Sequence, residues 1–185
     1  MVSIDGTDCA VEERGKWWYS HKFKRSGVRY EVGVSIKCGD IVWIKGPLPC
    51  GEWPDIKMFR DALIHYLDEN ERVEADGGYI GEAPSHVKTP NMFTRNEEKL
   101  AMQQRVRNRH ETVTKRFKQW GCIQQRFRHT IEKHSACFRA VAVLTQLCIE
   151  FGEPLFSVAE YSDIVTVQGN IVVEQDHNDD SSGSL

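Results

Sequence analysis

Apolar positions in the first fifty residues follow the pattern of an antiparallel sheet. Residues 2–4 form a short apolar run that ends at Asp5, which predicts a strand presenting a carboxylate into an Asp-Gly turn. Residues 17–23 form a second strand candidate. Residues 30–36 and 41–44 are separated by a Gly-Asp turn, which predicts a hairpin. Three successive antiparallel strands are therefore expected.

After residue 50 the spacing of apolar residues becomes helical. Apolar residues recur at intervals of three and four between Pro54 and Leu67, which predicts an amphipathic helix. Residues 72–75 predict a short strand that ends in a second Asp-Gly pair at Asp76. The proline-containing stretch 81–91 is expected to be a loop. The order strand, strand, strand, helix, strand indicates an α/β fold.

Two further helices are predicted in the second half of the chain. A long helix begins near residue 96 and carries its apolar residues on one face: Met102, Val106, Val113, Phe117 and Trp120. Residues 136–149 are apolar nearly all round, which predicts a helix packed on several sides. Residues 155–158 could add a short extended segment, and residues 164–173 look strand-like.

Length and composition favour one globular domain with a tail. The chain has 185 residues, of which 40% are hydrophobic and 28% charged, enough apolar residues for a core. It contains no apolar run long enough to span a membrane, and its acidic start does not resemble a secretory signal. The six cysteines are dispersed, which favours reduced thiols. The expected boundaries are a domain at 1–160, an uncertain extension at 161–173 and a disordered acidic tail at 174–185.

Positive charge is concentrated between residues 99 and 128. This stretch has nine Lys or Arg residues and a single acid, Glu111, for a net charge of +8. Such a block is typical of a polyanion binder, although a solvated helix face is the alternative. On a helix, Arg107, Lys115 and Lys118 share a flank with Glu111. These three cations are therefore candidates for binding a DNA backbone.

Five ordered motifs resemble the D-D-E superfamily endonuclease domain of PIF/Harbinger-type transposases. The motifs are Ile4-Asp5-Gly6-Thr7-Asp8, Trp18-Tyr19-Ser20-His21-Lys22, Gly51-Glu52-Trp53-Pro54-Asp55, Ala75-Asp76-Gly77-Gly78-Tyr79 and Arg109-His110-Glu111-Thr112-Val113-Thr114-Lys115-Arg116-Phe117-Lys118. The stretch 127–156 is also similar to the later part of such sequences. The resemblance thus covers about residues 1–160.

The resemblance implies an RNase H-like α/β fold, a mixed sheet flanked by helices, and a metal-dependent nuclease. Asp5, Asp76 and Glu111 match the catalytic, metal-binding acids, and Asp55 matches a further acid near the site, a candidate fourth metal ligand. The implied cofactor is Mg²⁺ or Mn²⁺, and the implied chemistry is two-metal cleavage of DNA phosphodiester bonds. The resemblance to eukaryotic transposases also implies a nuclear location.

Sequence-specific recognition of DNA is expected to come from a separate DNA-binding protein. Only four residues precede Asp5, whereas the family carries a helix-turn-helix region upstream, and the segment 9–16 is short. These departures leave a second hypothesis open. In this alternative the chain is a catalytically inactive, transposase-derived module that binds DNA or protein.

Three other groups have more than one interpretation. Cys122, His129, His134 and Cys137 could form a zinc site, but their spacing fits a buried thiol and surface imidazoles better. The aromatic run 17–19 could stack on unpaired bases, although core packing is commoner for tryptophan in a strand. His110 could position a phosphate or water, or simply be packed.

Overall fold

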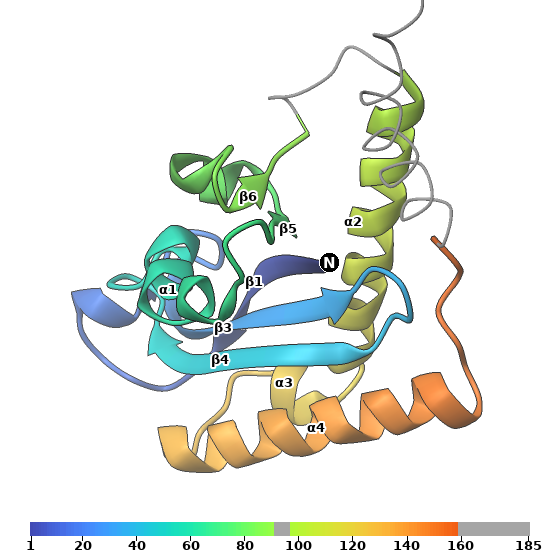
Figure 1. Ribbon diagram of the computed structural model, residues 1–185. Coiled ribbons are helices and arrows are strands. Elements are labelled where there is room, and N and C mark those ends of the chain that lie inside the picture. Colours follow the sequence, from blue (N-terminus) through green and yellow to red (C-terminus); the bar gives the residue numbers. More distant parts are fainter. Residues whose placement is uncertain (91–96, 159–185) are drawn as a thin grey trace, which may run out of the picture.

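A six-stranded mixed sheet forms the centre of the computed structural model, which describes residues 1–90 and 97–158 (Figure 1). The strands are β1 (Val2–Ala10), β2 (Tyr19–Ser20), β3 (Arg25–Ser35), β4 (Ile41–Pro49), β5 (Val73–Glu74) and β6 (Val87–Lys88). β3 pairs antiparallel with β1, β2 and β4, whereas β5 pairs parallel with β1 and with β6. The α/β class and the mixed sheet expected from the sequence are confirmed.

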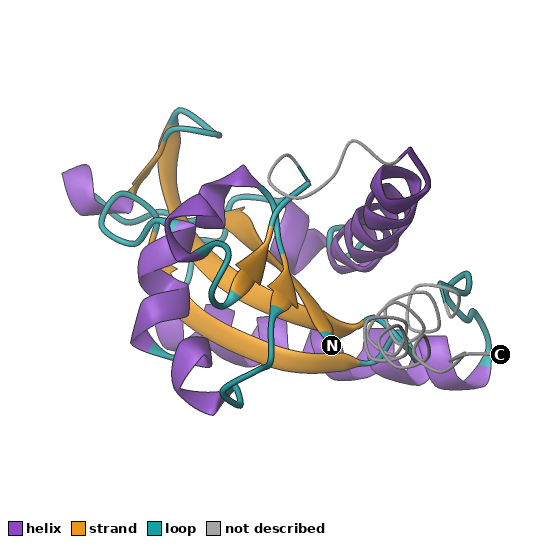
Figure 2. Cartoon of the chain, turned by 45° about the horizontal axis from the view of Figure 1, so that its top comes forward, coloured by secondary structure: helices purple, strands orange, loops and turns teal. Residues whose placement is uncertain are grey.

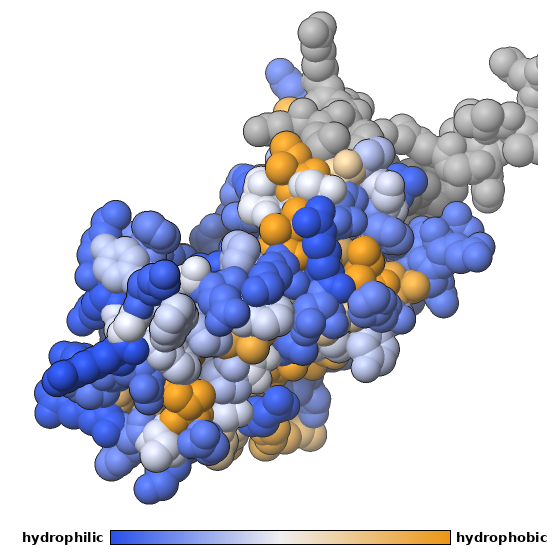
Figure 3. Space-filling view, turned by 90° about the vertical axis from the view of Figure 1, so that its left-hand side faces the viewer, coloured by the Kyte–Doolittle hydropathy of each residue, from blue (hydrophilic) through white to orange (hydrophobic). Residues whose placement is uncertain are grey.

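Helices lie on both faces of this sheet (Figures 1 and 2). The α-helices are α1 (Asp55–Asp61), α2 (Glu97–Phe117), α3 (Gly121–Gln124) and α4 (Ile131–Phe151), and the 3₁₀ helices are η1 (Lys16–Trp18), η2 (Leu63–Tyr66) and η3 (Gly77–Glu82). α1 and η3 cover one face, and α2, α3 and α4 cover the other. The face that Figure 3 presents is mostly hydrophilic, with scattered hydrophobic residues.

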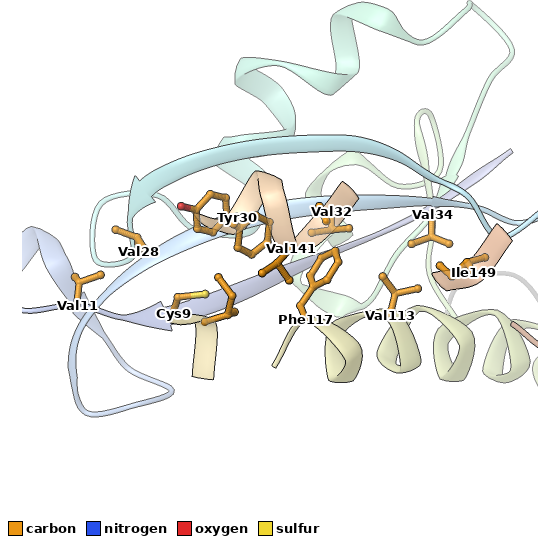
Figure 4. Close-up of a cluster of buried hydrophobic side chains, with 13 residues drawn as sticks. Cys9, Val11, Val28, Tyr30, Val32, Val34, Val113, Phe117, Val141 and Ile149 are labelled. Carbon is orange, nitrogen blue, oxygen red and sulfur yellow. The ribbon is translucent and has the colours of Figure 1, made fainter. Parts of the chain in front are cut away.

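The larger core lies between the sheet and α2, α3 and α4, and Figure 4 shows its side chains pointing toward one another. Alternate residues of β3 enter it: Val28, Tyr30, Val32 and Val34. This period of two follows from the pleat of a strand. The Tyr30 ring stacks on Phe138 of α4 with centroids 3.7 Å apart. α4 is thereby fixed beneath the sheet.

A smaller core fills the opposite face. It consists of Ile4, Phe59, Leu63, Val73, Ala75, Tyr79 and Val87. These residues come from β1, α1, η2, β5, η3 and β6, apart from Ala75, which follows β5, so the core joins the parallel half of the sheet to α1. This packing fixes the position of the segment that follows β5.

The first strand is longer than the sequence predicts. β1 runs through Asp5 and Gly6 and pairs with β3 along its whole length, from Val2 opposite Ser35 to Ala10 opposite Gly27. The prediction of an Asp-Gly turn at this position is wrong. Asp5 lies in the middle of a strand because its neighbour β3 continues to supply backbone partners.

Two other local predictions are also wrong. Most of the predicted strand at 17–23 is a 3₁₀ helix and a turn, and only Tyr19–Ser20 is extended. The predicted loop at 81–91 contains the short strand β6, which pairs with β5. Strands of two residues carry too little pattern to be read from sequence.

The sequence predicts the helices better than the short strands, although the helix ends are shifted. The predicted helix at 54–67 is α1 followed by the 3₁₀ helix η2. Trp120 lies beyond the end of α2 and is 43% exposed, so it does not belong to the buried stripe. α4 begins at Ile131 and leaves one apolar face exposed, contrary to the expectation of packing on several sides. Residues 155–158 form no strand, although Val158 is buried.

The remaining sequence expectations concern the ends of the chain and its thiols. The predicted strand at 164–173 and the acidic tail lie outside the described residues. In the described part of the chain, every helix is too short or too polar to cross a membrane. All six cysteines are free, as the sequence predicts.

Candidate active site

Asp5, Asp76 and Glu111 line one cavity of about 190 Å³. Asp5 lies in the middle of β1, Asp76 follows the end of β5, and Glu111 lies on α2. The three acids are distant in sequence but meet where the parallel pair of strands faces the long helix. The structure therefore brings together the three residues that the sequence motifs nominate.

The register of the sheet explains why the two aspartates are neighbours. Ser3 of β1 is paired with Glu74 of the parallel strand β5. Two residues further along each chain, Asp5 of β1 and Asp76, just beyond the end of β5, line the same cavity. The Ser3 Oγ atom is 3.1 Å from His110 Nδ1, and this contact ties α2 to β1 next to Glu111.

Asp5 is held in an environment that disfavours its charge. Its Oδ1 atom accepts a hydrogen bond of 2.8 Å from the backbone N–H of Gly6. Burial, followed by the negative charges of Asp76 and Asp55, raises the pKa of Asp5 to about 6. A nearby cation would lower this pKa again, because it favours the ionised carboxylate over the protonated form.

Asp76 and Glu111 are more exposed than Asp5. Asp76 Oδ1 accepts a hydrogen bond of 2.8 Å from Gly78 N–H and so caps the 3₁₀ helix η3. Glu111 is an exposed residue in the second half of α2. Both side chains are therefore open to solvent at the cavity.

Asp55 lies close to the aspartates but does not line the cavity. Its Oδ1 atom is 3.2 Å from Arg29 Nη1. Arg29 also bonds both oxygens of Asp8, which has a depressed pKa: burial opposes ionisation, but Arg29 and Ser20 outweigh it. Burial, together with Asp8 and Asp76, raises the pKa of Asp55 in spite of Arg29. Arg29 thus fixes Asp55 beside the cavity.

Sequence reasoning missed one carboxylate of the cavity, Glu74. Its side chain is 3% exposed, and burial raises its pKa to about 7. Gln103 Nε2 lies 3.3 Å from Glu74 Oε2 and donates a hydrogen bond to it. The only sequence signal was its position two residues before Asp76, on the same face of a short strand.

His110 also lines the cavity and is packed rather than free in solvent. It is 3% exposed, and burial lowers its pKa to about 4, so the ring is neutral at pH 7. This agrees with the packed alternative from the sequence. Its contact with Ser3 gives it a positioning role for the segment that carries Glu111.

The basic residues of α2, together with Lys118 directly after it, divide into two faces. Arg107 lines the cavity, Lys115 is exposed, and the Lys118 Nζ atom donates to Asp8 O at 3.2 Å while lying over the Phe23 ring. On the other face, three arginines bond main-chain carbonyls of the segment after α4. Arg105 binds Ser157, Arg109 binds Phe156, and Arg116 binds Glu153.

This division revises the charge argument from the sequence. Arg109 is 3% exposed and also donates to the carbonyls of Ser35 and Ile36, so it holds the end of β3. Part of the basic block therefore stabilises the fold. Arg107, Lys115 and Lys118 remain as the cations on the Glu111 side.

The zinc and base-stacking candidates from the sequence lie outside the cavity lining. His134 is fully buried, its Nδ1 atom is 2.8 Å from the Tyr30 hydroxyl, and it packs against Phe127. The prediction of a surface imidazole is therefore wrong for His134, whose contacts are those of a packed core residue. Trp17 and Tyr19 are 53% and 38% exposed, contrary to the core role favoured by the sequence, whereas Trp18 packs against the larger core.

The donor set of the cavity suits a hard divalent cation, because carboxylate oxygens are its preferred protein ligands. As the side chains stand, no three acidic, histidine or cysteine residues within the described ranges are placed to hold a metal ion. Rotation of the exposed Asp76 and Glu111 side chains would be needed to close such a site around Asp5. Comparison with protein-family models, with curated proteins and with solved structures finds no match to this chain.

Proposed function

We propose that the chain is a divalent-metal-dependent DNA endonuclease domain of the D-D-E type, related to PIF/Harbinger-type transposases. The single observation that carries this proposal is the meeting of Asp5, Asp76 and Glu111 in one cavity. Three acids from separate segments rarely converge without a cation or a proton to compensate them. Burial, followed by the charges of Asp76 and Asp55, raises the pKa of Asp5, as expected of a carboxyl group enclosed beside other acids.

The arrangement of the sheet supports an RNase H-like fold as part of the same proposal. The first acid is on the first strand, the second follows a later strand parallel to it, and the third is on a helix beside them. This is the order that the resemblance implies. It places all three acids at one end of the parallel strand pair.

The residues of the cavity would divide the work between binding the metal and binding the substrate. Asp5, Asp76 and Glu111 would hold Mg²⁺ or Mn²⁺, and the bound metal would supply activation of a water nucleophile and stabilisation of the leaving oxygen. Asp55, fixed by Arg29, would add negative charge beside them. Arg107 lines the same cavity and would hold the scissile phosphate without reading sequence.

The proposal extends to partners and location. DNA is the substrate, and a separate DNA-binding protein would supply sequence specificity. A nuclear location is part of the proposal because of the resemblance to eukaryotic transposases.

Nicking of supercoiled plasmid DNA with Mg²⁺ or Mn²⁺ tests this proposal. Asp5→Asn, Asp76→Asn and Glu111→Gln should each lower the nicking rate by at least about 100-fold, because each removes a metal ligand. Glu132→Gln, in the first turn of α4, is the matched control and should retain full activity. Undiminished cleavage by one of the three variants would exclude that residue from the site.

A catalytically inactive DNA- or protein-binding module is the second candidate. The observation that favours it is that the acids do not form a metal-holding group as they stand, within the described residues. DNA binding with a steep salt dependence, no turnover and no effect of metal would support this candidate.

A further inference from the structure

The outer face of α4 exposes an unusual number of large apolar side chains. Val143 is 61% exposed, Leu144 42%, Leu147 44% and Phe151 81%. α4 lies at the margin of the molecule, with the sheet and α3 on its inner side (Figure 1). The opposite side of the same helix supplies Phe138, Val141 and Ile149 to the larger core. The exposed residues therefore do not contribute to the core that the described residues form.

These side chains form one continuous stripe. At 100 degrees per residue, six positions fall within about 100 degrees of one another on the helix surface. They are Ala136, Ala140, Val143, Leu144, Leu147 and Phe151, all exposed. A helix with apolar residues on both its core face and its outer face needs a second packing partner.

We propose that α4 is a homodimer interface, in which two copies of this chain pack their α4 helices antiparallel about a two-fold axis between Val143 and Leu144. This interface goes beyond the nuclease proposal and does not depend on it. A two-fold axis makes one patch on both copies complementary to itself. The sequence of the stripe has this property.

Side-chain size is matched in the antiparallel arrangement. With the axis between Val143 and Leu144, Ala136 of one copy lies level with Phe151 of the other, and Ala140 lies level with Leu147. Small residues thus stand opposite large ones, which allows two helices to interdigitate. In a parallel pair, Phe151 would meet Phe151 and Ala136 would meet Ala136, leaving a crowded level and a void.

Charge is matched in the same arrangement. Arg139 and Glu150 are exposed and lie on the same flank of the stripe. Equal flanks are neighbours in an antiparallel pair, and the axis brings Arg139 of one copy within about 3 Å along the helix axis of Glu150 of the other, at 1.5 Å per residue. The interface would contain this ion pair twice. In a parallel pair, equal flanks lie on opposite sides of the interface, so this ion pair would not form.

The size of the stripe indicates a dimer of modest affinity. The four large side chains expose on the order of 400 Å² of apolar surface, judged from typical side-chain areas. Standard interfaces bury roughly 800 Å² per partner, so the helix pair with its polar rim lies at the lower end. We therefore expect a dissociation constant in the micromolar range.

Sedimentation equilibrium of the full chain tests the dimer. The mass should rise with concentration from 21.3 kDa toward twice that value. Leu147→Glu should remain at the monomer mass because it places a charge in the centre of the stripe. Ile80→Glu, at an equally exposed apolar residue of η3 on the other face of the sheet, is the control and should dimerise as the wild type does. Circular dichroism checks that both variants are folded.

Charge reversal tests the antiparallel arrangement. Arg139→Glu should weaken association at least several-fold, and Arg139→Glu combined with Glu150→Arg should restore it. A wild-type mass that stays at the monomer value up to several hundred micromolar would overturn the proposal. The outer face of α4 would then be covered by another protein or by another segment of the chain. Unchanged association of Leu147→Glu would overturn it as well, and failure of the double reversal would overturn the antiparallel packing.

Discussion

The two glycines that follow the cavity aspartates stand in different surroundings. A β-carbon at Gly6 would lie 1.9 Å from Asp55 Oδ1, whereas one at Gly77 would meet nothing within 4 Å. Gly6→Ala should therefore displace Asp55 and lower the free energy of unfolding by about 1–3 kcal/mol. Gly77→Ala is the matched control and should change it by less than about 0.5 kcal/mol. Urea denaturation of both variants measures this difference, and equal effects would show that Asp55 moves aside freely.

Glu31 should make the stability of the protein depend on pH. The residue is fully buried, its Oε2 atom accepts a hydrogen bond of 3.0 Å from Trp43 Nε1, and burial raises its pKa to about 7 from 4.5. The folded state therefore holds the proton more tightly than the unfolded state. The stability that Glu31 contributes is fully present below pH 4.5 and is lost as pH rises toward 7.

Glu31→Gln tests this dependence. The amide stays neutral and can still accept a hydrogen bond from Trp43, so the variant should be more stable than the wild type at pH 8, on the order of 2 kcal/mol. At pH 4 the gain should vanish. Thermal melts at the two pH values measure the effect, and an equal shift at both would mean that Glu31 does not titrate in this range.

At this scale, the ordered motifs identified the three acids of the cavity, and the sequence also named Arg107 and His110, which line it. Glu74 and the contacts between segments could not be predicted. Glu74 lines the cavity only because β5 pairs with β1 in one particular register. Likewise, the contact of Arg29 with Asp55 joins a strand to the start of a helix. Such contacts depend on packing between segments that carry no local pattern.

At the scale of elements, the sequence predicts long periodic segments well and short ones poorly. α2 and α4 carry repeated apolar positions over 21 residues each, and both were expected. The centre of β1 is polar, from Asp5 to Asp8, so its length was underestimated. That strand is defined by its pairing with β3 rather than by its own apolar pattern.

α2 offers a direct test of how one element serves both fold and binding. Replacing Arg107, Lys115 and Lys118 by Gln should weaken binding to DNA of any sequence. The slope of log K against log salt should fall by about 2.7 units, at 0.9 per phosphate contact. The fold should be retained. Titrations of duplex DNA at several salt concentrations measure the slope.

The matched control replaces the three arginines of the other face, Arg105, Arg109 and Arg116, by Gln. These side chains bond main-chain carbonyls, and Arg109 is buried, so this variant should lose about 2–4 kcal/mol of folding free energy. Where it remains folded, its salt slope should change less. Equal slopes in the two variants would mean that the Glu111 flank is an ordinary solvated surface.

At the scale of the whole molecule, the fold concentrates negative charge where the parallel strands meet α2. Burial, together with neighbouring aspartates, raises the pKa of Asp5 and of Asp55, and Glu74 is buried nearby. Such an arrangement destabilises the folded chain at neutral pH unless a cation or proton neutralises it. The overall formal charge of -3 gives no indication of this local concentration.

Divalent metal should therefore stabilise the folded protein, and this can be measured without any assay of cleavage. At a free Mg²⁺ or Mn²⁺ concentration tenfold above the dissociation constant, binding adds about 1.4 kcal/mol. For a chain of this size, that corresponds to a rise in Tm of roughly 3–6 °C. Asp5→Asn removes one of the clustered charges. The variant should melt higher than the wild type without metal and should show a smaller rise when metal is added.

Asp61→Asn provides the comparison for this last experiment, because Asp61 pairs with Lys45 at 2.9 Å on the surface, away from the cavity lining. Its melting temperature should follow that of the wild type with and without metal. If metal raises the Tm of the wild type and of Asp5→Asn equally, the cation binds elsewhere. If Asp5→Asn instead stabilises the metal-free protein and loses the response to metal, the cation binds among the clustered carboxylates. Their mutual repulsion then lowers the stability of the metal-free chain by a measurable amount.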